Sequence, residues 1–299
     1  MDFFLLIDKP SGITSFDVVY KVKKAFGIKK VGHSGILDKL ATGLLVVAVG
    51  KQATKLLEFL IHLDKTYEVE MILGMKSDTY DLSGNLEVFD GKVDFGDEEI
   101  LTILKSFEGE IMQKPPQYSA LKINGKRASD RVRQGEDVDL KARKVTVYRI
   151  ENFDRIKETR LNDSSGQGKR FRFNVHCSSG TYVRSLVHDL GAKLGCGAVM
   201  SNLRRVKVGG FDIKDSLKIE DLNKMDNATN HMQISINDIV NKLFCRINLN
   251  KIEFEKVKCG KIIVDHFEKE EENLAAFYDD QFVSILKKEG EILKVYKNF

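Results

Sequence analysis

Strand-like segments outnumber helical ones along this 299-residue chain, and the two kinds do not alternate in a regular order. Residues 169–177 show the strand pattern most clearly, because apolar and polar side chains alternate there. A doubly wound parallel sheet requires strands and helices that alternate. The sequence therefore predicts an α+β fold around a mixed, mostly antiparallel sheet. Extended segments are expected at residues 3–7, 44–49, 67–73, 117–123, 145–150, 169–177 and 203–208, and helices at 14–26, 51–63, 98–107 and 183–194.

The end of the chain has a pattern of its own. Residues 223–237 are polar and rich in asparagine, which is typical of a linker. Short strands are expected beyond it at residues 261–264, 282–286 and 293–296, with a helix at 249–257. We therefore predict a large domain over residues 1–230 and a small β-rich C-terminal domain over residues 238–299.

Charge is distributed unevenly along the sequence. The 48 Lys and Arg residues exceed the 44 acids by only four, an excess too small to indicate a nucleic-acid partner. Residues 114–147, however, hold nine basic and four acidic side chains, whereas residues 246–299 hold ten basic and eleven acidic ones. If the partner is a polyanion, the segment 114–147 should contact it. A solvated, highly charged surface loop is the alternative.

The sequence gives no sign of a membrane or secretory protein. No apolar run reaches the roughly 18 residues that span a bilayer, and the first residues lack the pattern of a signal peptide. The four cysteines have neither a C-x-x-C pair nor the spacing of zinc ligands. We therefore expect a cytoplasmic protein with reduced thiols, no membrane contact and no metal site.

A loop with three glycines, residues 32–43, has the most unusual local chemistry in the chain. Glycines let a backbone approach a ligand closely, and this loop also carries His33 and Asp38. A metal site lacks a third ligand at helical spacing, and a Ser-His-Asp triad lacks its G-x-S-x-G turn. Spacing alone favours the simpler interpretation, in which Asp38 caps a turn and His33 lies on the surface.

A second cluster, residues 178–185, lies between a predicted strand and a predicted helix. If its start is extended, Tyr182 and Arg184 share a face. Arg184 could then hold a carboxylate in a bidentate pair. Local sequence leaves open the alternative that Arg184 extends into water at an ordinary helix start.

Six segments match the motifs of one known family in the family's own order. The glycine loop is similar to G-H-[ST]-G-x-L-D-x-L-A-T-G, and residues 180–186 match G-T-Y-[IV]-R-[ST]-L. The other four are similar to K-P-x-G-x-x-S at residues 9–15, K-x-Y at 65–67, P-P-x-Y-S-A-L-K at 115–122, and L-G-x-x-A followed by L-R-R at 194–205. From about residue 3 to residue 212, the chain thus resembles the tRNA pseudouridine-55 synthases of the TruB family.

The resemblance implies a pseudouridine-synthase-like catalytic domain and an isomerase that converts uridine to pseudouridine at position 55, in the T-loop of tRNA. The implied catalytic aspartate is Asp38, with Arg184 paired to it and Tyr67 stacked on the target base. A carboxylate there could attack C1′ or remove a ribose proton, and the sequence leaves both routes open. The reaction needs no cofactor. The base must be flipped out of its stack to reach a buried site.

Further binding residues follow from the same motifs. The resemblance implies that Tyr182 and Leu203 line the pocket and that His33 stacks within the T-loop. Lys9 and Arg204, together with Arg205, would contact phosphates or the edge of the pocket. The basic segment 114–147 coincides with an insertion that closes over the T-arm in this family. No obligate protein partner is implied, and we expect a monomer.

Two alternatives and two departures from the family pattern remain. The chain could be an RNA-binding protein without catalysis, or it could act on ribosomal or small RNA. The family usually has proline after the catalytic aspartate, where this chain has Lys39. Residues 125–133 differ from the family's pattern in the insertion, so contacts cannot be transferred there. The C-terminal domain resembles a PUA-type RNA-binding domain only weakly, and its charge suggests an accessory role.

Overall fold

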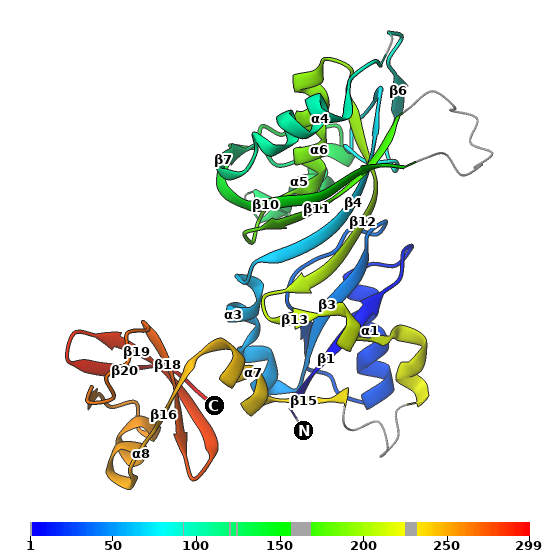
Figure 1. Ribbon diagram of the computed structural model, residues 1–299. Coiled ribbons are helices and arrows are strands. Elements are labelled where there is room, and N and C mark those ends of the chain that lie inside the picture. The colour runs from blue at the N-terminus through cyan, green and yellow to red at the C-terminus, as the bar shows by residue number, and fades with distance from the viewer. Residues whose placement is uncertain (1, 92, 120, 124, 157–168, 225–231) are drawn as a thin grey trace.

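A mixed sheet of eleven strands forms the centre of the molecule (Figure 1). The computed structural model describes residues 2–91, 93–119, 121–123, 125–156, 169–224 and 232–299. The long path of the sheet runs β14 (Leu217–Lys218), β1 (Phe3–Lys9), β3 (Thr42–Val49), β12 (Ala198–Val208), β4 (Lys65–Leu73), β11 (Arg170–Cys177), β10 (Arg143–Arg155) and β7 (Gly109–Gln113). Three short strands pair beside this path: β2 (Val31–His33), β13 (Phe211–Asp212) and β15 (Ile234–Ser235).

Most of the neighbouring strands are antiparallel. Within this sheet, the two parallel pairs among the described strands are β1 with β14 and β12 with β3. This topology confirms the predicted α+β class and the mostly antiparallel sheet. Strands β10 and β12 are longer than predicted, because their outer ends are paired in the sheet although they lack an apolar alternation.

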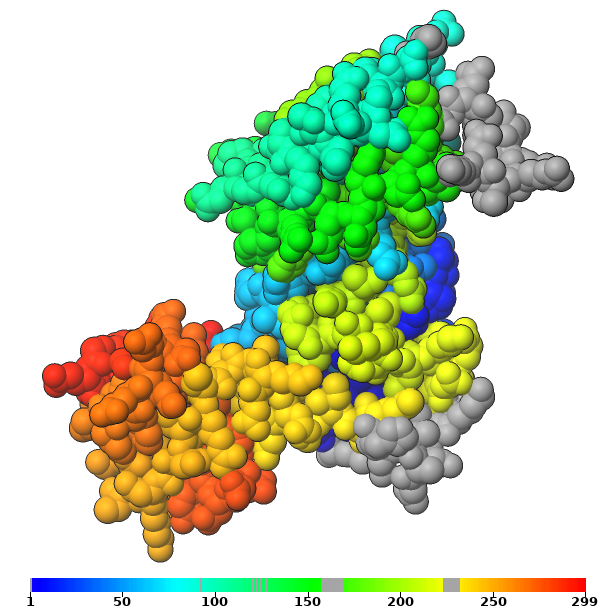
Figure 2. Space-filling model, viewed as in Figure 1, coloured from blue at the N-terminus to red at the C-terminus, as the bar shows by residue number. Residues whose placement is uncertain are grey.

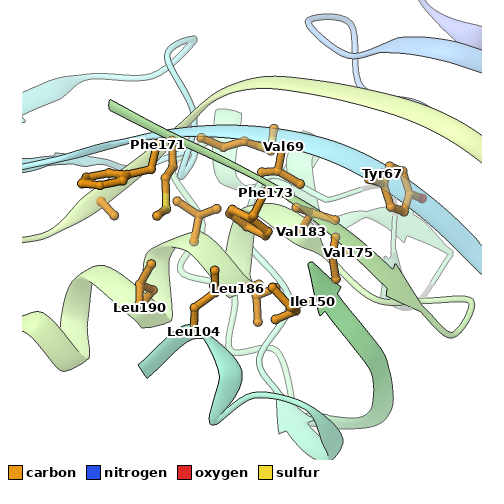
Figure 3. Packing of buried hydrophobic residues seen from close by; sticks show 14 of the residues in the cluster. Tyr67, Val69, Leu104, Ile150, Phe171, Phe173, Val175, Val183, Leu186 and Leu190 are labelled. Carbon is orange, nitrogen blue, oxygen red and sulfur yellow. The ribbon is translucent and has the colours of Figure 1, made fainter. Parts of the chain in front are cut away.

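One face of the sheet packs against two helices, α4 (Asp97–Lys105) and α6 (Val183–Leu194) (Figure 1). On β11 the alternate residues Phe171, Phe173 and Val175 are buried, as the predicted strand pattern requires. Figure 3 shows these side chains facing Leu186 of α6 across the core. This packing fixes the start of α6 against the strands, which matters for the site because Arg184 lies in its first turn.

Helix α1 (Ser15–Phe26) begins and ends where its sequence predicts. The Thr14 hydroxyl accepts a hydrogen bond from the Asp17 amide, and the Asp17 carboxylate accepts one from the Thr14 amide, which forms a capping box. Gly27 ends the helix in the left-handed region at φ 65°. The helix covers β1 and β3 with Val18 and Val22.

Two local predictions were wrong. Residues 51–63 form two short helices, α2 (Lys51–Lys55) and α3 (Leu57–Ile61), because the Leu56 amide bonds to the Ala53 carbonyl three residues back and tightens the turn. The predicted extended segment 117–123 contains only the short strand β8 (Lys122–Ile123), which pairs with β9 (Lys126–Arg127) before α5 (Ala128–Arg133). Residue 120 lies outside the described residues. The remaining short strands, β5 (Met75–Ser77) and β6 (Leu86–Val88), pair with each other.

A second sheet of five strands stands beside the first, at the left of Figure 1, and forms the separate orange and red body in Figure 2. Its order is β16 (Cys245–Asn248), β18 (Asn273–Tyr278), β19 (Gln281–Glu289), β20 (Ile292–Asn298) and β17 (Ile263–Val264), with α8 (Lys251–Lys258) between β16 and β17 in sequence. The small β-rich unit is therefore present. The sequence missed β16 and β18, and the exact domain boundaries stay a prediction.

The predicted linker, residues 223–237, is only partly a connection. Residues 225–231 lie outside the described residues, while β15 pairs with β1 and α7 (Ile236–Leu243) begins directly after it. Ile239 and Val240 of α7 belong to one apolar cluster that also contains Phe4 of β1 and Phe277 of β18. The end of the predicted linker is thus packed structure that joins the two sheets. The 3₁₀ turns Ile213–Asp215 (η1) and Ile219–Lys224 (η2) precede it.

Phe173 tests the core that holds α6 in place. We expect Phe173→Ala to lower the free energy of unfolding by about 3–5 kcal/mol, because the truncated ring leaves a cavity among fully buried neighbours. Urea unfolding followed by circular dichroism measures the change. Met112→Ala on β7, where the side chain is 68% exposed, is the control, and an equal loss in both variants would contradict this account of the core.

Candidate active site

Asp38 and Arg184 meet in a bidentate ion pair. The Nε of Arg184 lies 2.9 Å from Oδ2 of Asp38, and its Nη2 donates to Oδ1 at 3.2 Å. Asp38 follows β2 in the glycine loop, and Arg184 is the second residue of α6. The Arg184 side chain is 7% exposed, whereas that of Asp38 is 38% exposed. One partner is therefore fixed inside the protein, and the other presents its carboxylate to a ligand.

Three further groups hold the guanidinium of Arg184. Its Nη1 donates to the Thr79 carbonyl at 2.9 Å, and its Nη2 donates to the Tyr118 carbonyl at 3.2 Å. Asp81, almost fully buried, places Oδ2 at 3.6 Å from Nη1. Asp81 was not predicted from the sequence. The only local signal was a polar, glycine-containing stretch, residues 77–85, between two apolar segments.

The loop that presents Thr79 and Asp81 is held in a strained turn. Tyr80 between them has φ 64°, in the left-handed region that non-glycine residues seldom adopt. Its ring stacks on His188 of α6 with a centroid distance of 3.8 Å, and its carbonyl accepts from the Met200 amide at 3.0 Å. The stack and the hydrogen bond keep the turn in the conformation that places both groups on Arg184.

The Asp38 loop is fixed from two sides. The Ser15 hydroxyl at the start of α1 accepts a hydrogen bond from the Leu37 amide at 2.9 Å. At the other end, Gly43 has φ 106°, and a Cβ there would lie 2.3 Å from the carbonyl oxygen of Arg205. Only glycine permits this close approach of β3 to β12. The carboxylate of Asp38 is therefore presented by a loop with little freedom to move.

A cavity of about 440 Å³, here called the central cavity, opens beside the ion pair. Most of the sequence-predicted site residues line it: His33, Asp38, Tyr67, Tyr182, Arg184 and Leu203. Lys65 and Arg205, and the exposed isoleucines Ile36 and Ile61, also line it. The structure thus brings together residues from four distant parts of the sequence around one hollow.

Tyr67 is a buried phenol at the start of β4. Burial raises its pKa, so the hydroxyl keeps its proton at neutral pH. The guanidinium of Arg205 hydrogen-bonds to this side chain and is itself held by the Leu44 carbonyl at 2.8 Å. Arg205 is 1% exposed, so it supports the wall of the cavity instead of reaching out from its edge.

His33 and Lys65 line the cavity and have lowered pKa values. Burial and the charge of Arg205 lower the pKa of His33, and its Nδ1 accepts a hydrogen bond from the Gly35 amide at 3.2 Å. Burial lowers the pKa of Lys65 to about 8, and its Nζ donates to the carbonyls of Ile61 and Leu63. At neutral pH the imidazole of His33 is therefore neutral, whereas the amine of Lys65 stays mostly protonated, with these two carbonyls as its acceptors.

Lys9 and Arg204 lie outside the central cavity. Lys9 is fully buried, and its Nζ donates to the carbonyls of Pro10 at 2.9 Å and Ile13 at 2.8 Å, so the expected direct phosphate contact does not fit its position. Arg204 points to Asp8, with contacts of 2.7 and 3.2 Å. Both cations stabilise the turn after β1 in this structure.

Two family models match the chain. Residues 23–183 match the TruB family pseudouridylate synthase (N terminal domain), and residues 184–242 match the tRNA pseudouridylate synthase B C-terminal domain. The chain belongs to the TruB family. It is therefore an isomerase of the pseudouridine synthase class.

Individual relatives match the sequence of this TruB-family chain over most of its length. It is 42% identical over 265 residues to tRNA pseudouridine synthase B of Clostridium acetobutylicum, which covers 89% of this chain and 84% of the relative. It is 37% identical over 306 residues to tRNA pseudouridine synthase B of Streptococcus pneumoniae serotype 4, which covers both chains completely. Among solved structures, a chain of the crystal structure of a Cbf5-Nop10-Gar1 complex superposes with a TM-score of 0.71 at 25% identity, covering 99% of this chain and 84% of that chain.

Metal ligands do not gather anywhere in the described part of this TruB-family chain: no group of three or more His, Cys, Asp or Glu side chains could hold an ion there. No helix within the same described residues is long and apolar enough to cross a membrane.

Arg184→Gln tests how much the fold depends on the buried guanidinium. We expect a loss of about 3–5 kcal/mol in the free energy of unfolding, because the change leaves buried Asp81 without its charged partner and the Thr79 carbonyl without its donor. Asp38→Asn is the matched variant on the exposed side of the pair and should cost under about 1 kcal/mol. Urea unfolding of both variants compares them, and equal losses would contradict the asymmetry.

Lys9 gives the TruB-family chain a pH-dependent term in stability. Burial lowers the pKa of Lys9 to about 8 from 10.5, so between these values the unfolded chain binds a proton that the folded chain has released. Its contribution to stability therefore rises with pH across this window. We expect Lys9→Met to be most favourable relative to the wild type below about pH 8, with the difference shrinking toward pH 10.5. Urea titrations across this pH window measure the free energy of unfolding, and Lys258→Met at an exposed position is the control. A difference between Lys9→Met and wild type that does not change with pH would contradict this account.

Proposed function

We propose that this chain isomerises the uridine at position 55, in the T-loop of tRNA, to pseudouridine, with Asp38 as the catalytic aspartate. The observation that carries the proposal is the exposed carboxylate of Asp38, held by a buried guanidinium at the edge of the central cavity. The names of the relatives, tRNA pseudouridine synthase B, support tRNA as the substrate. A tRNA substrate also supports the expected cytoplasmic location.

The reaction breaks the bond between uracil N1 and ribose C1′, rotates the base and joins C5 to C1′. A carboxylate can act as a nucleophile at C1′ or as a base toward the ribose, and both roles need its position relative to the sugar to be fixed. The two contacts from Arg184 fix the plane of the Asp38 carboxylate. The isomerisation is redox-neutral, so it requires no electron carrier.

The central cavity suits a detached uracil. Its volume of about 440 Å³ lies in the range of small-molecule pockets, and Leu203 and Tyr67 supply apolar surface. Such walls exclude water from the intermediate, and stacking on Tyr67 would hold the base while it rotates. The neutral phenol of Tyr67 would lie near C5, from which a proton must leave after the new bond forms.

A uridine within a folded loop must leave its stack to enter this cavity, at a cost of a few kcal/mol. RNA loops are recognised through shape and unstacked bases, and His33 at the rim offers a neutral ring for stacking. The basic segment 114–147 supplies α5, whose Arg133 lines the same hollow as Tyr118 and Arg184. We infer that this segment closes on the T-arm and that the chain needs no protein partner.

Asp38→Asn tests the catalytic assignment. We expect it to abolish release of tritium from tRNA labelled at uridine C5, since the amide can neither attack C1′ nor take a proton. Its affinity for unmodified tRNA should stay within a few-fold of wild type, because the carboxylate acts on the glycosidic bond and not on docking.

Three outcomes would contradict parts of this proposal. Turnover by Asp38→Asn would remove Asp38 from the catalytic role. Tight tRNA binding by a wild-type protein that releases no tritium would favour an RNA-binding protein without catalysis. Faster turnover of ribosomal RNA fragments than of T-arm hairpins would reassign the substrate.

A further inference from the structure

A second hollow, here called the side groove, adjoins the central cavity at the Asp38–Arg184 pair. It measures about 680 Å³, and its described lining shares only Asp38 and Arg184 with the central cavity. The rest of its lining comes from residues 11–12 and 39–40, from the turn at residues 78–85, and from Tyr118 and Arg133. A strand of RNA whose target ribose sits at Asp38 must leave the central cavity past this pair, so the side groove lies on a path open to its backbone.

The side groove is lined by equal numbers of acidic and basic side chains, and this balance affects whether it can bind an RNA backbone. Its lining holds three carboxylates, Asp38, Asp78 and Asp81, and three cations, Arg184, Lys39 and Arg133. Arg184 is engaged by Asp38 and Asp81. Without Lys39 and Arg133 the lining would be net negative and would repel a phosphate. These two side chains therefore decide whether the groove accepts an RNA backbone.

Lys39 is exposed, but its backbone is held firmly. Its carbonyl accepts a hydrogen bond from the Gly12 amide at 2.9 Å, and the next carbonyl, that of Leu40, accepts one from the Ser11 hydroxyl at 3.0 Å. Among the described residues, no carboxylate forms an ion pair with its ammonium group. Hydrogen bonds from Thr14 lower the pKa of Asp17 and the charge of Lys39 helps to lower it further, but the Asp17 carboxylate accepts its hydrogen bond from the Thr14 amide. An anchored lysine next to Asp38 is placed to meet a phosphate that flanks the target ribose.

Arg133 reaches the same groove from α5, the last residue of that helix. Its side chain is 71% exposed, and its contact with Asp130 is long, at 3.8 Å. The neighbouring Arg131 is instead committed to Glu136 at 2.6 Å. Arg133 is thus the α5 arginine that remains available to a ligand in the groove.

We propose that Lys39 and Arg133 together bind one backbone phosphate adjacent to the target uridine, as a clamp across the side groove. This inference rests on the proposed function and adds a positioning role that the motifs do not assign. The clamp holds the strand next to the target nucleotide, so it acts on docking and leaves the bond-breaking step to Asp38.

Binding measurements test the clamp with full-length protein and unmodified tRNA. Lys39→Gln and Arg133→Gln should each weaken binding about three- to tenfold at physiological salt and lower the slope of log K against log salt by about one. KM should rise while kcat at saturating tRNA stays within about twofold. Lys39→Arg should restore both values, because it restores the charge. Lys258→Gln, on exposed α8, is the matched control and should change neither.

Two further binding measurements test whether the two side chains share one phosphate. One uses the double variant, and the other uses RNA in which an uncharged methylphosphonate replaces a single phosphate. The double variant should bind more tightly than the product of the two single losses predicts, since the second change removes a contact already weakened. A T-arm hairpin with a methylphosphonate on the 5′ or the 3′ side of the target should bind wild type less tightly at one of these positions, and there Lys39→Gln should cause no further loss.

Each contrary result has a separate meaning. Three results would overturn the clamp while wild-type turnover stands. The salt slopes could be unchanged in both single variants, or the affinity losses could multiply in the double variant. Alternatively, Lys39→Gln could weaken the binding of both methylphosphonate hairpins as much as it weakens the binding of unmodified RNA. A wild-type protein without tritium release would instead overturn the proposed function.

Discussion

The buried guanidinium of Arg184 is the interaction on which the site depends. It pairs with the exposed carboxylate of Asp38 and with buried Asp81, and it donates to two backbone carbonyls. Desolvating an arginine is costly unless all its donors are used, so these partners must stay in place together. The glycine loop, the strained turn at Tyr80 and the segment at Tyr118 are therefore tied to one side chain, and that side chain fixes the orientation of Asp38.

The same pair separates two hollows of different character. The central cavity is walled by Tyr67 and Leu203 and suits a base, whereas the side groove is lined by charged and polar groups and suits a backbone. A flipped nucleotide has both parts, joined at its ribose. In the proposed function, the sugar would lie at the carboxylate, the base on the apolar side and a phosphate on the charged side.

Local sequence predicted the elements whose signals are complete within a few residues. The capping box at Thr14 and the glycine after Phe26 gave α1 its ends, and alternation on β11 gave its buried face. The single helix expected over residues 51–63 failed, since apolar spacing does not report the tightened turn at Leu56. Likewise β16 and β18 were missed, because β16 is half polar and both strands depend on pairing with neighbours distant in the sequence.

The sequence by itself determined the family, the mostly antiparallel α+β class and the residue types at the site, because motifs and periodicity are local. The family resemblance also implied the pair of Asp38 and Arg184, which lie 146 residues apart. Only the tertiary structure decided that Asp81 joins this pair and that Lys9 turns inward onto its own loop. Burial and pairing are properties of neighbours in space. A lysine in a motif carries no mark of whether its amine will meet water or a carbonyl, and packing alone makes that choice.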